Sequence, residues 1–466
     1  MGDQLYIQYY KWSKTQSKKL FRSCKILDME SLQFYLPLFS LYFYIHNTPY
    51  SLKTIDFKRK YYVSELLEIT KQRYYNSNMF LKASIYDSGK NIHTEKEIFC
   101  KTIPILEAIH CLNNNYNLVH KNNYHLPSNY NYNTFHKINN MNNTAYIDVF
   151  CSYLFGQLTQ SKINPSFPIF YGSINGIGNY KYDITEEYNE LRIDKCFNTN
   201  LGKGFTMDMY VSDSESDSES GSEDTINDDY IAHIRRIPLQ LLFIEKLNGT
   251  LEDILNNNYS DNLLISCLFQ ISFALTYLQK HYQFTHNDLH INNIMYQETE
   301  KKFIYYKKNN IYFKVPTYGK IFKIIDFGRA IFTFKNKVFM NDVFTDTSEA
   351  GGQYTYPNQI SFMEKKKKTD EIIPNYNFDL CRLSMTILDE LPEEMIENKE
   401  LQVLLHKLCT NKKGESFCDM DDDFRLYISI ARDASHALPQ NVIENKLFKH
   451  YRVPKKQFAK KSFYSL

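Results

Sequence analysis

Three residues in the second half of the chain have the types and spacing that phosphoryl transfer from Mg-ATP requires. Asp288 is followed five residues later by Asn293, and Asp326 stands directly before Phe327-Gly328. A positioned carboxylate can accept the hydroxyl proton of an acceptor, and the oxygens of an amide and a second carboxylate are ligands that Mg²⁺ prefers. We therefore expect Asp288 to be the catalytic base and Asn293 and Asp326 to hold Mg²⁺.

Two neighbouring residues have supporting roles in this interpretation. His286 is expected to brace the loop through hydrogen bonds, and Gly328 to allow a backbone conformation that other residues resist. The motif that contains Asp288 and Asn293 and the D-F-G motif at 326–328 could each arise by chance. They occur in this order, however, and each lies beside a strongly apolar strand or helix, which favours a catalytic site.

The same chemistry needs a cation for the nucleotide phosphates. Lys101 ends the segment 98–101 (IFCK), which alternates like an early strand, although a lone strand lysine is more often solvated. The usual partner of such a lysine is a helix glutamate. The helix expected over 144–160 contains no glutamate and a single acid, Asp148. We therefore predict that Asp148 pairs with Lys101.

A loop that contacts the phosphates is expected before the strand at 78–86. The segment 73–78 (RYYNSN) contains no glycine, although glycines let backbone N–H groups approach phosphates closely. Asparagine and serine still form turns. Ser77 and Asn78 are therefore the candidate nucleotide-binding residues of this loop.

These motifs, in this order, resemble the eukaryotic protein-kinase-like superfamily over roughly residues 70–450. Within it, the catalytic half is similar to haspin-type kinases. Leu289-His290 stands where typical kinases have Leu-Lys, a hairpin insert with Val315-Pro316 and Gly319 precedes the second carboxylate, and 378–383 (FDLCRL) resembles a helix of that group. The composition also resembles that of kinases encoded by large DNA viruses.

The resemblance implies a bilobal α+β fold with a small antiparallel-sheet N-lobe and a larger, mainly helical C-lobe. It implies ATP and Mg²⁺ as cofactors, a protein Ser or Thr as acceptor, and Asp379 as a residue that holds the catalytic loop through backbone N–H groups. An ordinary helix N-cap is the alternative role of Asp379. The adenine base is expected to meet Phe243, Ile244, Glu245 and Lys246.

The distribution of apolar residues places strands first and helices later, which also indicates an α+β fold. Strands are predicted at 78–86, 97–105, 167–174, 237–247 and 321–325, a hairpin at 302–315, and helices at 144–160, 261–282, 376–391 and 399–409. The expected division is an extension of mixed, helical character over 1–70, an N-lobe over 71–247, a C-lobe over 248–450 and a basic tail over 451–466. Within the N-lobe, 111–143 is expected to be an Asn-rich loop and 212–229 an acidic, disordered segment.

Composition excludes several other classes. The net charge of +2 gives no strong signal for nucleic acid, and the apolar run at 32–45 is shorter than a membrane span. The nine cysteines are scattered without a C-x-x-C pair, which is typical of a reducing, intracellular compartment. This favours the cytoplasm, or a virion for a viral protein. The basic stretches 365–368 and 454–461 read as solvated segments, with nuclear targeting as the alternative. The oligomeric state is not indicated.

Two other functions remain open at this level. A nucleotide-binding pseudokinase scaffold is favoured by the missing glycines and by Asp148, and is opposed by the intact Lys101, Asp288, Asn293 and Asp326. A small-molecule phosphotransferase would share the lobes and would suit His290. It usually has an acid-rich helical subdomain, which the sequence after Asp379 does not show.

Overall fold

The computed structural model describes residues 9–11, 13–33, 55–57, 59–116, 129–211, 228–345, 348–354, 374–420, 424–458 and 461–466. The acidic segment up to residue 227, the apolar run from residue 34 and the basic stretch 365–368 lie outside this part of the chain. The fold is mixed α+β with mainly antiparallel sheets, as expected. The chain forms two compact units: unit 1 comprises Met1–Tyr146 and Tyr171–Glu245, and unit 2 comprises Ile147–Phe170 and Lys246–Leu466.

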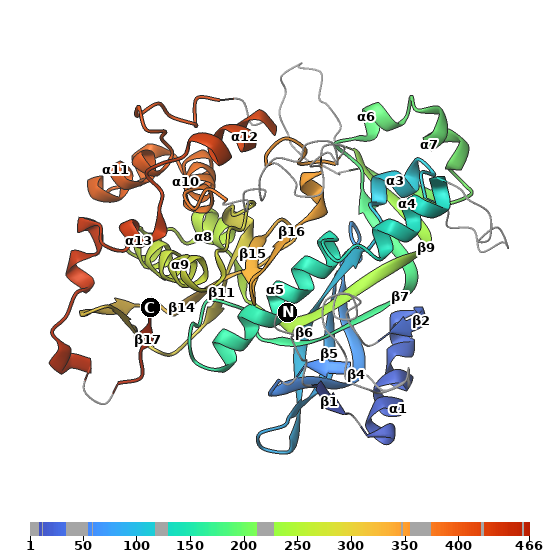
Figure 1. The fold of residues 1–466 in the computed structure, drawn as a ribbon, viewed down its shortest axis with the longest axis horizontal. Helices are drawn as coiled ribbons and strands as arrows, with labels where there is room; N and C mark the ends of the chain where they lie inside the picture. The colour runs from blue at the N-terminus through green and yellow to red at the C-terminus, as the bar shows by residue number, and fades with distance from the viewer. Residues whose placement is uncertain are drawn as a thin grey trace. The chain divides into compact units, whose positions relative to one another are not determined.

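Unit 1 is built on a seven-stranded sheet with the order β2-β7-β9-β6-β5-β4, and β8 pairs with β9 off this path. Alternate apolar residues of β5, such as Leu81 and Ile85, are buried, as a strand with one face on a core requires. Figure 1 shows β4, β5 and β6 as neighbouring strands. The bounds are β2 Glu30–Gln33, β4 Tyr61–Gln72, β5 Met79–Asp87, β6 Ile92–Pro104, β7 Phe170–Asp183, β8 Phe205–Val211 and β9 Asp228–Glu245.

Two local expectations for unit 1 were wrong. Residues 61–70, expected to be mixed and helical, belong to β4, because Val63 and Leu66 bury their side chains in the sheet. The segment 111–143, expected to be a loop, contains helix α4 (Asn129–Ile138). The many asparagines of this segment led to the prediction of a loop, because asparagine favours turns and caps over helix interiors.

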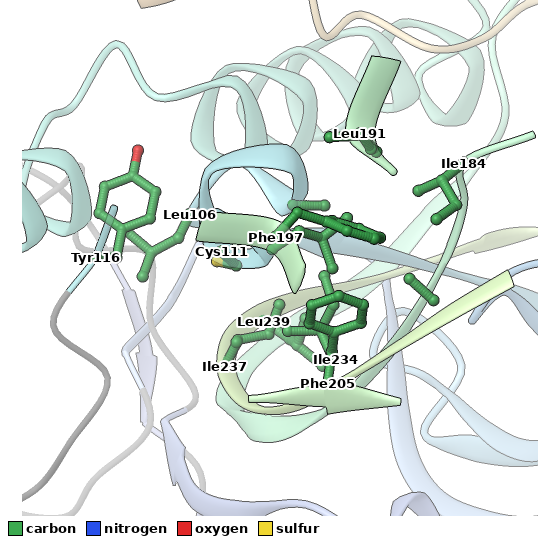
Figure 2. Packing of buried hydrophobic residues seen from close by; sticks show 13 residues of the cluster. Leu106, Cys111, Tyr116, Ile184, Leu191, Phe197, Phe205, Ile234, Ile237 and Leu239 are labelled. Carbon is green, nitrogen blue, oxygen red and sulfur yellow. The ribbon is translucent and has the colours of Figure 1, made fainter. Parts of the chain in front are cut away.

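A second apolar cluster of unit 1 lies beside the sheet (Figure 2). It joins side chains of α3 (Ala108–Leu112), α6 (Tyr188–Leu191), α7 (Lys195–Asn200), β8 and β9. Phe197 and Phe205 pack at a centroid distance of 4.9 Å in its centre. Unit 1 also contains α1 (Lys14–Ser23), whose N-terminus forms a capping box between Ser13 and Gln16, and the short pair β1 (Tyr9–Lys11) and β3 (Ile55–Phe57).

Unit 2 is organised around α9 (Asp261–Tyr282), which is almost entirely buried. Its length and hydropathy would suffice for a membrane span, but 83% of its most apolar window is buried inside the protein. Phe269 of α9 contacts five other aromatic rings, those of Phe273, Tyr306, Phe313, Phe448 and Tyr451. The other helices are α5 Thr144–Gln160, α8 Leu251–Asn257, α10 Phe378–Glu390, α11 Lys399–Leu408, α12 Phe424–Asp433 and α13 Pro439–Val442.

Helix α5 matches its predicted bounds, but most of it groups with unit 2 and not with the N-lobe region to which the sequence assigned it. The reason is aromatic packing. Phe150 contacts Phe332, Phe334 and Phe339, which belong to the hairpin formed by β15 (Ile331–Phe334) and β16 (Lys337–Met340).

Two small sheets complete unit 2. β10 (Gly249–Thr250), β11 (Ile294–Glu298) and β14 (Lys320–Ile324) form one of them. The predicted hairpin is present as β12 (Phe303–Lys308) and β13 (Ile311–Pro316), and β17 (Tyr464–Ser465) adds to it in parallel. The basic tail packs on this hairpin through Phe458, which is buried against Tyr305 and Tyr312. Residues 454–457 and 461 are exposed, as expected of a solvated basic stretch.

Candidate active site

A buried carboxylate holds the segment that contains the proposed base. Asp379, in the first turn of α10, accepts hydrogen bonds from the backbone N–H groups of His286 and Asn287, each at 3.0 Å. The N-cap of α10 is Asn377, so the alternative of an N-cap role for Asp379 is wrong. Burial raises the pKa of Asp379, while the nearby His286 and the two N–H donors oppose that rise.

His286 and Asn287 fix the start of the loop through their side chains. His286 donates from Nε2 to the carbonyl oxygen of Ile325 at 2.9 Å, which confirms its bracing role. Asn287 adopts a left-handed conformation with a φ of 64°, which asparagine tolerates better than most residues. Its amide donates to the carbonyl of Arg329 at 3.0 Å and accepts from the hydroxyl of Tyr354 at 2.8 Å. The loop is thus tied to both sides of the D-F-G segment.

The amide of Asn293 is committed to two acceptors. Nδ2 donates to the main-chain carbonyl of Asp288 at 2.9 Å and lies 2.9 Å from Nε2 of His290. Burial lowers the pKa of His290, and its neutral ring accepts at Nε2 in the tautomer that is protonated at Nδ1. The backbone N–H of Asn292, 3.3 Å from Nδ1, is a donor only to the other tautomer, so the shorter contact with Asn293 assigns the ring. Both amide hydrogens are then used, and Oδ1 is the remaining polar atom of the Asn293 side chain. It is a hard, neutral oxygen of the kind that binds Mg²⁺.

Asn293 and Asp326 lie at the same end of the β11–β14 ladder. Ile294 pairs with Ile324, so Asn293 precedes one strand where Asp326 follows the other. The backbone N–H of Ile325 donates to the carbonyl of Asn293 at 3.1 Å and extends the ladder. Sheet pairing thus brings together two residues that are 33 positions apart in the sequence.

In the D-F-G segment, the residue with a left-handed backbone is Asp326, whose φ is 60°. The φ of Gly328 is not positive. The expectation for Gly328 was therefore wrong. The strained backbone lies at the carboxylate itself, where it sets the direction of the side chain. Such strain, of order 1 kcal/mol or more, persists only where surrounding contacts enforce it.

Asp148 has a contact that the sequence did not predict. Its Oδ1 accepts a hydrogen bond from the backbone N–H of Phe327 at 3.0 Å, and its side chain is buried. The ring of Phe327 packs edge-on against Phe155 of the same helix at 5.1 Å and lies 5.6 Å from His286. Helix α5 therefore holds the backbone next to Asp326 by both a charge-assisted hydrogen bond and aromatic packing.

A group of residues around Asp288 was missed by sequence reasoning. The hydroxyl of Tyr427, on α12, donates to Oδ1 of Asp288 at 3.3 Å. The guanidinium groups of Arg382 and Arg329 lie over the Tyr427 ring, 5.2 and 5.7 Å from its centroid. Burial and the Asp288 charge raise the pKa of Tyr427, so its hydroxyl is protonated at neutral pH. No motif marks Tyr427, which comes 139 residues after Asp288.

The candidate nucleotide-binding residues of unit 1 lie on adjoining strands. In β6, Lys101 pairs with Leu242 of β9, and the neighbouring pairs place Phe243, Ile244 and Glu245 opposite residues 98–100. Asn78 lies next to this region, because its Oδ1 accepts from the backbone N–H of Thr102 at 2.9 Å. The sheet of unit 1 therefore brings together Asn78, Lys101 and residues 243–245, which are predicted to bind the phosphates and the base.

Ser77 is engaged within the sheet. Its hydroxyl accepts from the N–H of Lys181 at 2.8 Å, and its carbonyl accepts from the Thr102 hydroxyl at 2.7 Å. Lys101 belongs to unit 1, whereas Asp148, Asp326 and Lys246 belong to unit 2. The Lys101–Asp148 pair and the roles of these residues stay predictions.

Comparison with known proteins gives one distant likeness. No family model matches the chain. A protein of Drosophila melanogaster described as a serine/threonine-protein kinase haspin homolog is 29% identical to it over 153 residues. The match covers 32% of this chain and about a quarter, 26%, of that protein. This similarity supports a protein-kinase-like relationship and suggests a kinase-like function. The resemblance to viral kinases stays an expectation from the sequence.

Proposed function

We propose that this protein is an ATP-dependent Ser/Thr protein kinase with a bilobal fold, which transfers the γ-phosphate of Mg-ATP to a protein hydroxyl. One observation carries the proposal: Asn293, tied to Asp288 and His290, keeps only its oxygen for ligation beside the strand that leads to Asp326. The haspin-type likeness supports the same class of reaction.

Each residue has a distinct role in the proposed reaction. Asp288 accepts the proton of the acceptor hydroxyl, and its carboxylate is kept in place by the loop that Asp379 anchors. Asn293 and Asp326 would hold Mg²⁺ through oxygen atoms, and the ion would neutralise phosphate charge when bound. Lys101 would hold the phosphates, with Asp148 as its predicted partner, while Asp148 also accepts from the backbone N–H of Phe327. Phe243, Ile244, Glu245 and Lys246 are the residues that would bind the adenine base.

The test is phosphate transfer by the purified full chain. We expect labelled Mg-ATP to transfer phosphate to generic protein acceptors, with loss of transfer in Asp326→Asn. Asp288→Ala is expected to lower the chemical step far more than it lowers ATP affinity, because the base acts on the acceptor. Equal losses in both quantities would contradict the role of Asp288. Label that accumulates on a small alcohol and on no protein would point to a small-molecule phosphotransferase.

A nucleotide-binding scaffold without transfer is the second candidate, and one observation favours it. The two candidate side chains of the glycine-free loop are used by the sheet itself, since Ser77 accepts from Lys181 and Asn78 accepts from Thr102. A loop whose polar side chains are hydrogen-bonded within the sheet has fewer groups that can bind phosphates. Nucleotide binding with no labelled product, under conditions where the Asp326→Asn variant binds equally well, would favour the scaffold.

A further inference from the structure

Three cysteines meet in unit 2, outside the site described above. Cys381 lies on α10, Cys409 is the C-cap residue of α11, and Cys418 lies nine residues further on. The thiol of Cys409 lies between two acceptors that share its single hydrogen, the carbonyl oxygen of Cys381 at 3.9 Å and the sulfur of Cys418. Cys381 and Cys409 are buried, whereas Cys418 is exposed. One member of the group is thus open to solutes, and its thiol neighbour is protected.

The backbone holds Cys409 and Cys418 close together. Thr410 and Ser416 form an antiparallel bridge, and the N–H of Phe417 donates to the carbonyl of Cys409 at 2.8 Å. Gly414 supplies the turn of this short hairpin, with a φ of 84°. Cys409 therefore lies at the open end of this hairpin, hydrogen-bonded through its carbonyl to the residue before Cys418. A disulfide needs closely placed α-carbons, and this backbone pairing brings the two segments side by side.

The pKa values of the Cys418 and Cys409 thiols are shifted in opposite directions. The hydrogen bond from Cys409 lowers the pKa of the Cys418 thiol to about 7, although burial and the charges of Asp389 and Asp419 oppose this. The same hydrogen bond and burial raise the pKa of Cys409. Cys418 therefore carries a large thiolate fraction at neutral pH, and the thiolate is the nucleophilic form of cysteine.

We propose that Cys418 is a peroxide-reactive thiol whose resolving partner is Cys409. The Cys418 thiolate attacks the outer oxygen of a hydroperoxide. An S–O bond forms, the O–O bond breaks, and the alkoxide or hydroxide leaves as an alcohol or water after taking a proton. Cys409 then attacks this sulfur, an S–S bond forms, the S–O bond breaks, and the released hydroxide takes the Cys409 proton to become water. In total, two thiols are oxidised and one hydroperoxide is reduced.

Disulfide formation removes the only hydrogen that Cys409 has on sulfur. The contact from this thiol to the carbonyl of Cys381 is then lost, two residues beyond Asp379 on α10. The oxidised state consequently alters the surroundings of the helix that anchors the loop of Asp288. This consequence for transfer rests on the proposed function, whereas the disulfide itself does not.

Peptide mapping tests the disulfide directly. Lys412 and Lys413 lie between the two cysteines, so trypsin separates them into different peptides. After hydrogen peroxide treatment of the full chain, we expect the two peptides to remain joined, with a mass two hydrogens below their sum, and to separate on reduction. Cys418→Ser should abolish the joined species, while Cys196→Ser, at another exposed cysteine, should not. Oxidation of Cys418 to sulfinic acid with no joined peptides would overturn the assignment of Cys409.

The pH dependence of alkylation provides a second readout that needs no enzymatic activity. In the wild type, iodoacetamide should label Cys418 with a midpoint near pH 7. Cys409→Ala removes the hydrogen-bond donor and should move the midpoint toward that of an ordinary thiol, about 8.5. Cys409→Ser keeps a donor and should move it less. A wild-type midpoint already near that of Cys196 would contradict the proposal, whether or not the Cys409 variants fold.

Discussion

The side-chain amide of Asn293 donates to the main-chain carbonyl of Asp288 at 2.9 Å. The residue proposed to hold a metal ion thus closes the loop that carries the residue proposed as base. Nε2 of His290 lies at the same distance from the amide nitrogen. Because the two contacts use both amide hydrogens, the amide cannot flip without losing at least one bond.

Asn293→Ala is expected to abolish this arrangement. It removes a proposed Mg²⁺ ligand and opens the loop, so we expect transfer to fall by about 100-fold or more and the half-saturating Mg²⁺ concentration to rise. The measurement is initial rate against Mg²⁺ concentration at fixed ATP. Asn292→Ala is the matched control, because Asn292 is exposed and its amide donates to Glu252 at 2.8 Å. Equal effects of the two substitutions would contradict the metal role.

His290 is expected to make transfer sensitive to acid. Burial lowers its pKa below 6.5, against the raising effects of Asp288 and Asp326, and His286 and Arg382 lower it further. The ring is therefore neutral at pH 7 and accepts from Asn293; protonation below the lowered pKa removes this acceptor. The folded state binds fewer protons than the unfolded chain in this window, so stability also falls as the pH drops below 6.5.

The corresponding measurement is the pH profile of transfer, with a parallel unfolding series. His290→Gln keeps an acceptor oxygen but does not titrate, so its acid limb should lie at lower pH than that of the wild type, with near-normal transfer at pH 7. An unchanged acid limb in His290→Gln would assign the titration to another group.

Local pattern was sufficient to predict much of the secondary structure. The helices over 144–160 and 261–282 were predicted with their observed bounds, because long apolar periodicity is dominated by burial. The strand at 61–72 and the helix at 129–138 were missed, since tertiary contacts outweighed a mixed composition in the first and asparagine content in the second. Helix α5 was found, but its association with unit 2 depends on ring packing that no local pattern reveals.

The candidate site was predictable only where chemistry is encoded in short motifs. Asp288, Asn293 and Asp326 are marked by spacing, and the anchoring role of Asp379 followed from the family resemblance. The contact from Tyr427 to Asp288 spans 139 positions and depends on how α12 packs. Likewise, nothing in the sequence indicates that the backbone of Phe327 would donate to Asp148.

Asp379 is expected to matter for stability independently of transfer. Asp379→Ala leaves two buried N–H groups, those of His286 and Asn287, without their acceptor, at a cost of about 1–3 kcal/mol each. Asp379→Asn retains one oxygen and should cost less. Urea unfolding measures both values. Asp433→Ala, at an exposed ion pair with Arg432, is the control and should change stability by less than about 1 kcal/mol. A loss for Asp379→Ala as small as that of the control would refute the anchoring role.

Tyr427 is expected to position the base. Two guanidinium groups lie over its ring, and its hydroxyl donates to Oδ1 of Asp288, so it restricts the rotation of that carboxylate. Tyr427→Phe keeps the ring contacts with Arg329 and Arg382 and removes the hydrogen bonds of the hydroxyl, to Asp288 and to the Arg382 side chain. A bond of this kind contributes about 1 kcal/mol, which corresponds to roughly a fivefold loss in kcat with an unchanged KM for ATP. Tyr277→Phe is the matched control and should leave kcat unchanged, because Tyr277 lies on α9, where its ring packs on His281. A rise in kcat with Tyr427→Phe would show instead that the hydroxyl competes with the acceptor for Asp288, because removing a competitor frees the same oxygen for the incoming proton.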